Sequence, residues 1–400
     1  MDIRETDSEY VAATYSRFPL TVTGGHGSVL VGDDGREYID LGTGIAVNTF
    51  GMCDGEWVEA VKKQLDTCGH TSNLYYTEPC AVLAKMLCGR TGMKKVFFSN
   101  SGAEANECAI KAARRFAFRK YGDESRSTVI TLKNSFHGRT VTTLAATGQD
   151  AFHTEFGPFT GGFVYAEAGD LDGLEALCKQ GCCAVMFECV QGEGGVNALD
   201  ADFVHGIFGL CEKYGMLTIA DEVQCGNGRS GKLYAYMNYG VTPDIVTTAK
   251  GLAGGLPLGA TMFGERTADI YTPGSHGSTF GGNPICAAGA VNVLSRIDDD
   301  LLAGVVHRSE TIRSYLTGKP GIVSISGMGL MLGIETVKSA ADVITYCREH
   351  GVLVLSAKNK VRLLPALNIP ENLLCRALEV IAASAAEGSA ILFPRGGDAG

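Results

Sequence analysis

Residues 217–251 read LTIADEVQCGNGRSGKLYAYMNYGVTPDIVTTAKG, and this stretch indicates both a fold and a chemistry. Its apolar segments 217–220 and 244–249 predict two short buried strands, one leading to Asp221 and the other to Lys250. Burial favours the neutral, nucleophilic form of a lysine, whereas a buried carboxylate favours a neighbouring cation such as a protonated pyridine nitrogen. The hypothesis is an aldehyde cofactor between these two side chains, and pyridoxal phosphate is one cofactor with such a nitrogen. The alternative is a solvated surface lysine, which is the commoner situation after a strand.

The overall composition is that of a soluble globular protein. The chain has 400 residues, 45% of them hydrophobic and 20% charged, with a net charge of −10. This length predicts about two domains. The acidic balance argues against nucleic acid or an anionic membrane surface as a partner. We find no secretory signal and no apolar run of membrane-spanning length, so we expect a cytoplasmic protein.

The fourteen cysteines are scattered through apolar patterns and show no CxxC spacing. In a reducing compartment they are expected to act as small core residues and not as disulfide partners. The eight histidines are also dispersed, and no HExxH motif or Cys/His cluster is present in the sequence. We therefore expect no metal site.

From residue 94 onward, apolar strands alternate with helical segments such as residues 170–180 and 201–214. This alternation predicts an α/β fold with a mostly parallel central sheet that is buried on both faces. Ligands of such sheets bind at the carboxyl ends of the strands. The residues at the predicted strand ends are Ser101, Phe136, Glu188, Asp221 and Lys250.

The two ends of the chain follow other patterns. Residues 28–41 alternate around an Asp-Gly turn and predict a hairpin. The pattern after about residue 300 is α+β, with expected strands that include residues 351–356. We expect an N-terminal arm (1–45) that contributes to the small domain, a large cofactor-binding domain (46–297) and a C-terminal small domain (298–400). The final GGDAG is expected to be frayed.

Several motifs near the predicted strand ends suit ligand binding. Ser101, Gly102 and Ala103 open a helix, where backbone N–H groups favour a phosphate, although Ser101 followed by Glu104 is also a common helix cap. Phe136 would stack on a planar ring or belong to the core. Arg139 would bind a substrate carboxylate or remain solvated.

Two further segments suggest an internal ion pair. Glu193 lies in the glycine-rich segment QGEGG (191–195), where the backbone passes close to a ligand. Arg362 lies between apolar residues on a short predicted strand, so it needs a carboxylate partner. A pair between Glu193 and Arg362 is therefore conceivable.

Taken together and in order, these motifs resemble those of the class III, fold type I pyridoxal phosphate aminotransferases. The resemblance covers about nine tenths of the chain, and no single motif is specific by itself. The matching stretches are YIDLGTGIAVN, HTSNLYY, FFSNSGAEANE, NSFHGRT, QGEGGV, IADEVQCGNGRSGK, PDIVTTAKGLAGGLPLGA, GSHGSTFGGNP, GLMLGIE and RLLPALNI. The implied fold is a large domain with a mostly parallel central sheet and a smaller α+β domain.

The resemblance also assigns roles to individual residues. Lys250 would be the catalytic residue, holding pyridoxal phosphate and then moving a proton. Asp221 would pair with the pyridine nitrogen and Gln224 with the phenolic oxygen. Val223 and Phe136 would lie on either side of the ring. The phosphate would be bound by Ser101, Gly102 and Ala103, and by Thr279 across a subunit interface. The implied active unit is a homodimer with its active site at the interface.

The closest resemblance is to members that use N2-acetyl-L-ornithine and 2-oxoglutarate in arginine biosynthesis. It implies that Arg139 binds the carboxylate far from the cofactor and that Ser278 lies near the substrate. Arg362 would bind the α-carboxylate of glutamate, and Glu193 would neutralise Arg362 when acetylornithine is bound. Ornithine, succinylornithine and 4-aminobutyrate remain alternative donors. An aminomutase, or a non-catalytic cofactor-binding dimer, is a further alternative.

The sequence departs from the family pattern at two places. The usual Gly-His-x-His-Pro is replaced by residues 51–57, GMCDGEW, and the usual proline before QGE is replaced by Cys189. Neither change falls on an implied cofactor contact, but both leave the local loop geometry and the substrate preference open.

Overall fold

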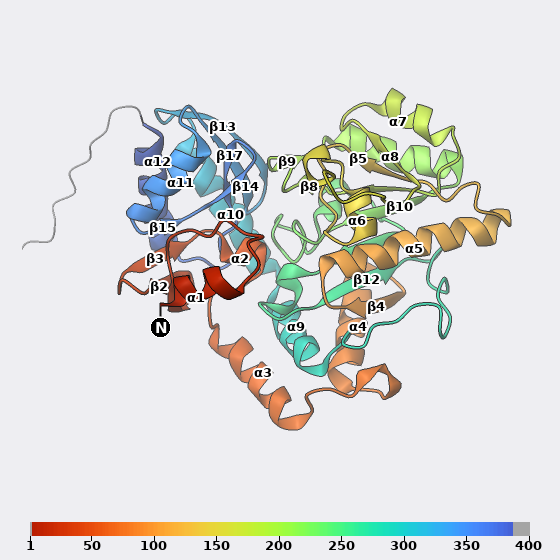
Figure 1. Cartoon of the computed structure of the whole chain (residues 1–400), viewed down its shortest axis with the longest axis horizontal. Coiled ribbons are helices and arrows are strands. Elements are labelled where there is room, and N and C mark those ends of the chain that lie inside the picture. Colours follow the sequence, from red (N-terminus) through yellow and green to blue (C-terminus); the bar gives the residue numbers. More distant parts are fainter. Residues whose placement is uncertain (1, 387–400) are drawn as a thin grey trace, which may run out of the picture.

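The computed structural model describes residues 2–386, and the predicted frayed tail GGDAG lies outside them. Figure 1 shows a larger lobe built around a central sheet and a smaller lobe formed by both ends of the described chain. The central sheet has seven strands, in the order β4 (Lys95–Ser99), β12 (Gly259–Phe263), β11 (Ile245–Thr248), β10 (Leu217–Asp221), β7 (Ala184–Phe187), β5 (Val129–Leu132) and β6 (Phe163–Ala166).

The prediction of a mostly parallel sheet is confirmed, with one exception. Strand β12 pairs antiparallel with both of its neighbours, β11 and β4, and the other described pairs are parallel. The apolar run GATMF is buried along its whole length. Because a strand that is buried on both faces reads the same in either direction, the sequence pattern does not indicate its orientation.

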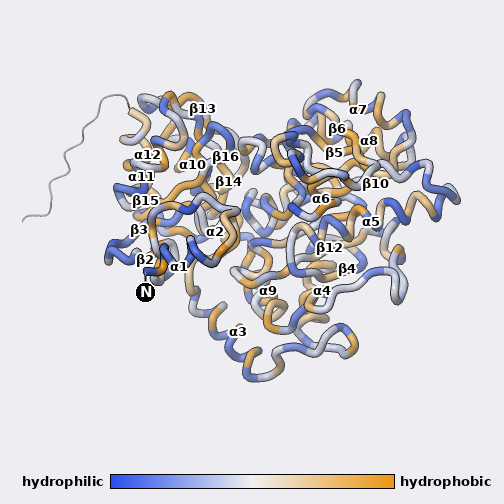
Figure 2. The backbone as a smooth tube through the Cα atoms, in the orientation of Figure 1, coloured by the Kyte–Doolittle hydropathy of each residue, from blue (hydrophilic) through white to orange (hydrophobic). Residues whose placement is uncertain are grey.

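Helices cover the sheet and bury its two faces. They include α4 (Glu78–Thr91), α5 (Gly102–Tyr121), α6 (Val141–Ala146), α7 (Leu171–Cys178) and α8 (Ala201–Tyr214). Helix α9 (Pro284–Arg296) packs on α4, and α3 (Gly55–Thr67) packs on α9. The long helix α5 places an alanine-rich face against the strands, where Ala109, Ala112 and Ala113 are fully buried. Such small side chains let helix and sheet approach closely. Figure 2 shows hydrophobic residues gathered around the sheet and hydrophilic ones along the outer loops.

The smaller lobe combines N-terminal and C-terminal elements. The predicted hairpin is confirmed as β2 (Val29–Gly32) and β3 (Glu37–Asp40), and β3 also pairs in parallel with β15 (Val352–Leu353). The remaining elements of this lobe are α1 (Ile3–Tyr10), β1 (Val22–His26), α10 (Asp299–Leu316), β13 (Ile322–Met328), β14 (Met331–Thr336), α11 (Ala340–Glu349), β16 (Leu355–Ala357), β17 (Lys360–Leu363) and α12 (Glu371–Ala385).

The prediction of a single strand over residues 351–356 is wrong. Strand β15 belongs to the sheet of the N-terminal hairpin, whereas β16 pairs with β17 in a second four-stranded sheet. The chain changes sheets at the buried Val354. A continuous apolar run conceals this change because every residue in it is suited to burial.

The short element α2 (Thr43–Ala46) is a left-handed turn. The backbone φ angles are positive at Thr43, Gly44, Ile45 and Ala46. This conformation is sterically unfavourable for residues with a Cβ, and Ile45 is β-branched. The turn is held by Asp40, whose Oδ1 accepts hydrogen bonds from the N–H groups of Gly42 (2.8 Å) and Thr43 (2.9 Å). It delivers Val47 to the central cavity.

All fourteen cysteines lie in the described part of the chain and are free thiols. Nine are buried and one, Cys53, is exposed. The buried ones pack among apolar side chains, as predicted, and burial raises the pKa of Cys183 and Cys347 to about 12. Within residues 2–386 no helix combines the length and the apolar character needed to cross a membrane.

Candidate active site

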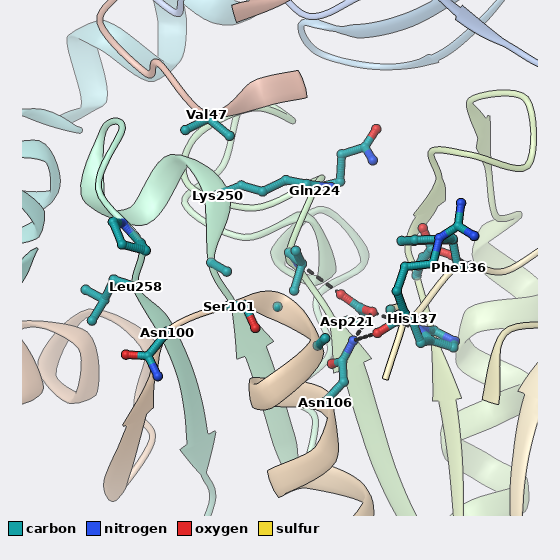
Figure 3. Close-up of a pocket in the computed structure, with 18 of the residues that line it drawn as sticks. Val47, Asn100, Ser101, Asn106, Phe136, His137, Asp221, Gln224, Lys250 and Leu258 are labelled. Atoms are coloured by element: carbon teal, nitrogen blue, oxygen red, sulfur yellow. Dashed lines mark hydrogen bonds and ion pairs between the residues drawn. The ribbon is translucent and has the colours of Figure 1, made fainter. Parts of the chain in front are cut away.

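A cavity of about 450 Å³ lies at the strand ends of the central sheet. The five residues that the sequence placed at strand ends all line it: Ser101, Phe136, Glu188, Asp221 and Lys250. Figure 3 shows these walls converging from helices, strands and the loops between them. The parallel strands explain the convergence, because their carboxyl ends meet at one edge.

Asp221 is the most highly connected side chain of the cavity. It is 3% exposed and ends β10. Its Oδ2 accepts a hydrogen bond from Asn106 Nδ2 (2.8 Å) and lies 2.7 Å from His137 Nδ1, while its Oδ1 accepts one from the Val223 N–H (3.0 Å). These contacts fix the orientation of the carboxylate (Figure 3). Within the described chain, no lysine or arginine forms a salt bridge with it.

Lys250 follows β11 directly and also lines the cavity. Its backbone φ is 44°, an unusual value for a residue other than glycine, so the chain turns sharply as it leaves the strand. Burial lowers the pKa of Lys250, and this effect exceeds the opposing influence of Glu193 and Asp221. The lysine is thereby biased toward the neutral amine that acts as a nucleophile.

The amino terminus of α5 forms a second wall of the cavity. Ser101 is the helix cap: its Oγ accepts a hydrogen bond from the Glu104 N–H (3.2 Å), and the Glu104 carboxylate accepts one from the Asn100 N–H (2.5 Å). Among the described residues, the N–H groups of Gly102 and Ala103 have no hydrogen-bond acceptor. Two free donors at the start of a twenty-residue helix form a suitable anion site.

Apolar side chains form the remaining sides. Val223 and Phe136 line the cavity, and Val223 packs directly on Gly102. A Cβ at Gly102 would lie 2.6 Å from Cγ1 of Val223, so only glycine permits this contact. The pair Phe136 and Phe152 meets edge to face at 5.7 Å. The cavity therefore combines apolar walls with a few fixed polar groups, as small-molecule sites commonly do.

The conceivable pair between Glu193 and Arg362 is present in the structure. Nη1 of Arg362 donates to Oε1 of Glu193 at 2.5 Å and to Oε1 of Gln224 at 3.1 Å. Gln224 lines the cavity and also donates to Glu193 (3.3 Å). Burial alone would raise the pKa of Glu193, but the charge and hydrogen bond of Arg362 outweigh burial and lower it. The Nε of Arg362 is buried without a partner in the described chain.

Arg139 lies at the cavity and is exposed. Its guanidinium lies 4.1 Å from the ring centroid of Phe152 and 5.6 Å from that of Phe136. Within residues 2–386, it forms no salt bridge with a carboxylate. A guanidinium supported by aromatic faces and with free donors can bind an incoming carboxylate.

Ser278 and Thr279 do not line the central cavity. Oγ of Ser278 accepts a hydrogen bond from Asn100 (3.2 Å), so it reaches the edge of the cavity. Thr279 instead lines a second cavity of about 350 Å³, together with His70, Asn73 and Tyr76. Thr279 is therefore not among the residues that line the central cavity.

Sequence reasoning missed two polar residues that hold Asp221. Asn106 is a buried amide within the alanine-rich face of α5, and His137 is 2% exposed. The sequence did contain a signal at Asn106, because an amide among core-facing alanines needs a hydrogen-bond partner. Glu188 was identified only as a strand-end residue. It is 5% exposed and lacks a cationic partner in the described chain.

These features match the chemical groups of pyridoxal phosphate. The free N–H groups of Gly102 and Ala103 suit its phosphate. Asp221, which has no lysine or arginine partner among the described residues, suits a protonated ring nitrogen, and Lys250, whose pKa is lowered by burial, suits its aldehyde. In residues 2–386, no group of three or more histidine, cysteine or acidic side chains is arranged to hold a metal ion. The cofactor implied by the sequence resemblance therefore fits the residues present.

Comparison with known proteins gives a family match over most of the chain. The sequence model of the family "Aminotransferase class-III" matches residues 10–384. The acetylornithine aminotransferase of Haemophilus ducreyi is 48% identical over 383 residues, which cover 95% of this chain and 97% of that protein.

Solved structures resemble the fold over a similar extent. The ornithine aminotransferase of Toxoplasma gondii superposes with a TM-score of 0.90 at 30% identity, covering 95% of this chain and 93% of that one, and that structure reveals partial occupancy of PLP at the active site. The N-acetylornithine aminotransferase of Stenotrophomonas maltophilia has a TM-score of 0.82 at 32% identity, covering 95% of this chain and 97% of that one.

Proposed function

This chain belongs to the class-III aminotransferases, which are pyridoxal phosphate enzymes, and we propose that it is an acetylornithine aminotransferase. It transfers the terminal amine of N2-acetyl-L-ornithine to 2-oxoglutarate, giving N-acetyl-L-glutamate 5-semialdehyde and glutamate, in arginine biosynthesis. The observation that carries this proposal is the 48% identity with the Haemophilus ducreyi enzyme over 95% of the chain. The separate positions of Arg139 and Arg362 support it, because the two substrates differ in where they carry carboxylates.

In this proposal, the residues of the cavity divide the catalytic work. Pyridoxal phosphate, when bound, supplies an aldehyde that exchanges its oxygen for an amine and a ring that withdraws electrons. Lys250 would anchor the cofactor and then move a proton at the substrate carbon, and burial lowers the pKa of its amine, which favours both roles. Asp221 keeps a proton on the ring nitrogen, and Asn106 and His137 hold that carboxylate in place.

The remaining contacts position the cofactor. Gln224 would donate to the phenolic oxygen, and the apolar Val223 and Phe136 would contact the ring. Gly102 and Ala103 would bind the phosphate through their free N–H groups, close to Ser101 at the helix start. Water would be excluded by the apolar walls, which strengthens these polar contacts.

Arg139, Arg362 and Glu193 would distinguish the two substrates. Acetylornithine reacts at its terminal amine, so its carboxylate lies far from the cofactor, where Arg139 has free donors. Glutamate reacts at its α-amine and brings a second carboxylate to Arg362. When acetylornithine is bound, Glu193 neutralises Arg362, as it does in the present geometry. Glu193→Gln is expected to impair the acetylornithine half-reaction, and unchanged rates for both substrates would refute this switch.

We also propose that the protein acts as a homodimer. Thr279 lines a cavity whose surroundings expose large apolar side chains, including Leu74 (84%), Tyr75 (72%) and Phe280 (59%). Exposed apolar patches of this kind mark protein interfaces. Across a twofold interface, Thr279 of one subunit would contribute to the phosphate site of the other, and Ser278 would lie near the substrate.

A half-reaction screen tests the substrate assignment. The holoenzyme is mixed separately with acetylornithine, succinylornithine, ornithine and 4-aminobutyrate, and the absorbance change of the bound cofactor is followed. Acetylornithine is expected to react with the highest kcat/KM. Faster conversion by ornithine or 4-aminobutyrate would overturn the assignment, and turnover without 2-oxoglutarate would favour an aminomutase.

A further inference from the structure

We propose that Glu188 is a positioning residue that couples the loop carrying Phe136 to the loop carrying Glu193. Glu188 follows β7 and lines the central cavity. The inference rests on the proposed function, because it concerns how the cofactor-contacting loop and the substrate switch are held relative to each other.

Each carboxylate oxygen of Glu188 binds a different loop. Oε1 accepts a hydrogen bond from the Phe136 N–H at 2.8 Å, and Oε2 accepts one from the Gly192 N–H at 3.3 Å. The side chain is 5% exposed, so both bonds are shielded from water. One rigid carboxylate thereby sets the separation of two segments that are more than fifty residues apart in the sequence.

The two loops also contact each other directly. Nε2 of Gln191 donates to the carbonyl oxygen of Lys133 at 2.9 Å. A Cβ at Gly194 would lie 2.5 Å from the carbonyl oxygen of Asn134, so the backbones touch at this point. A displacement of one loop must therefore move the other, because close-packed backbones cannot pass through each other.

The loop held by Oε2 positions the substrate switch. Gly192 immediately precedes Glu193, which binds Arg362. Gly192 also packs against Gln224, since a Cβ there would lie 2.4 Å from Oε1 of Gln224. The Glu188–Gly192 bond thus fixes the backbone from which Glu193 reaches the arginine, while the Glu188–Phe136 bond fixes the backbone of a cavity-lining ring.

Glu188 is buried, but its carboxyl group is not paired with a lysine or arginine of the described chain. Among the described residues, it has no lysine or arginine in salt-bridge contact, and burial raises its pKa to about 7. A buried carboxyl without a cation is costly, so an apolar residue would be expected here on packing grounds alone. The two backbone N–H groups that it satisfies account for its presence.

Two substitutions of Glu188 test its hydrogen bonds to Phe136 and Gly192 separately. Glu188→Gln retains one acceptor oxygen, which serves the shorter bond to Phe136, and places an NH2 group opposite the Gly192 N–H. Glu188→Ala removes both bonds. Glu222→Gln is the matched control, because Glu222 is also buried and accepts two backbone N–H bonds, from Ala235 and Tyr236 (2.8 Å each), but does not line the cavity.

Two readouts are measured on the holoenzyme variants: the rate of cofactor loss on dialysis, and the ratio of kcat/KM for acetylornithine to that for glutamate. Glu188→Gln is expected to lower this ratio about tenfold with little change in cofactor loss, because only the Glu193 loop is released. Glu188→Ala is expected to lower the ratio and also to speed cofactor loss about tenfold. Glu222→Gln is expected to lower Tm without altering either readout.

The proposal is overturned if the Glu188 variants change both readouts no more than Glu222→Gln does. If the Glu188 variants yield no soluble holoenzyme, Gln191→Leu tests the same coupling by removing the bond to Lys133. An unchanged ratio of kcat/KM values in that variant would also overturn the proposal. Failure of the proposed function has a different signature, namely a wild-type enzyme that does not react with acetylornithine. Cofactor loss does not depend on the amino donor and still tests the role of Glu188.

Discussion

The proposed mechanism depends most directly on the side chain of Lys250. Its amine reaches the cavity from a sharply turned backbone, and burial lowers its pKa. We expect Lys250→Ala to reduce kcat by about 10³-fold or more, because both the nucleophile and the proton carrier are lost. Steady-state assays with saturating pyridoxal phosphate measure this loss. The exposed Lys62→Ala serves as control, and full activity of the Lys250 variant would refute the mechanism.

Glu193 predicts a pH dependence of stability. Because Arg362 lowers its folded-state pKa despite burial, the stabilisation from this pair is fully present above the ordinary pKa of a glutamate, about 4.3. It is lost as the pH falls through the lowered folded-state value. We expect wild type to have a higher Tm than Glu193→Gln at neutral pH, with the gap closing in acid. Thermal melts from pH 3 to 8 measure the gap, and a gap that widens in acid would contradict the assignment.

Some residues of the site could be predicted from the sequence, and others could not. Asp221 and Lys250 could be predicted because each ends its own apolar strand, and this pattern is local. Asn106 and His137 could not be assigned to Asp221, because they are 115 and 84 residues away from it. Sequence periodicity describes one segment at a time, whereas these hydrogen bonds exist only after three segments have been brought together.

The close contact between the start of helix α5 and Val223 requires a glycine at position 102. We expect Gly102→Ala to speed cofactor loss about tenfold, because its Cβ would lie 2.6 Å from Val223 and displace the free N–H groups. Dialysis of the holoenzyme measures the effect.

Gly89→Ala is the matched control for this substitution. Gly89 lies within α4, and a Cβ there would meet no atom within 4 Å. We expect this variant to gain about 0.5–1 kcal/mol of stability and to retain the cofactor as wild type does. Equal cofactor loss from the two variants would show that the approach of Val223 to the helix start is unimportant.

Elements were predictable where one physical signal dominates. The helix expected at residues 201–214 has the same bounds as α8, and in the structure Asp200 caps its start. The left-handed turn at residues 43–46 was not predictable, since Ile45 and Ala46 ordinarily avoid positive φ. Tertiary contacts impose that conformation: the backbone N–H groups of the turn donate to Asp40, and the Thr43 hydroxyl donates to the Leu364 carbonyl oxygen (2.6 Å).

The proposed dimer predicts complementation between two inactive variants. If Thr279 acts across the interface, a mixed dimer of Lys250→Ala and Thr279→Ala chains has one site with both lesions and one intact site. Random pairing after co-expression should restore about a quarter of wild-type activity, because half of the dimers are mixed and each has one intact site. Affinity tags of two kinds isolate the mixed dimers. Activity no greater than that of Thr279→Ala alone would mean that Thr279 acts within its own subunit.

The distribution of the cysteines makes their alkylation a measure of local unfolding. Nine of the fourteen cysteines are buried and only Cys53 is fully accessible, so an alkylating reagent applied to the native protein should modify Cys53 first. Each buried thiol becomes reactive only when its surroundings open. Because these thiols occur in both lobes, for example Cys108 on α5 and Cys347 on α11, the order in which mass spectrometry detects their alkylation would show which lobe opens first.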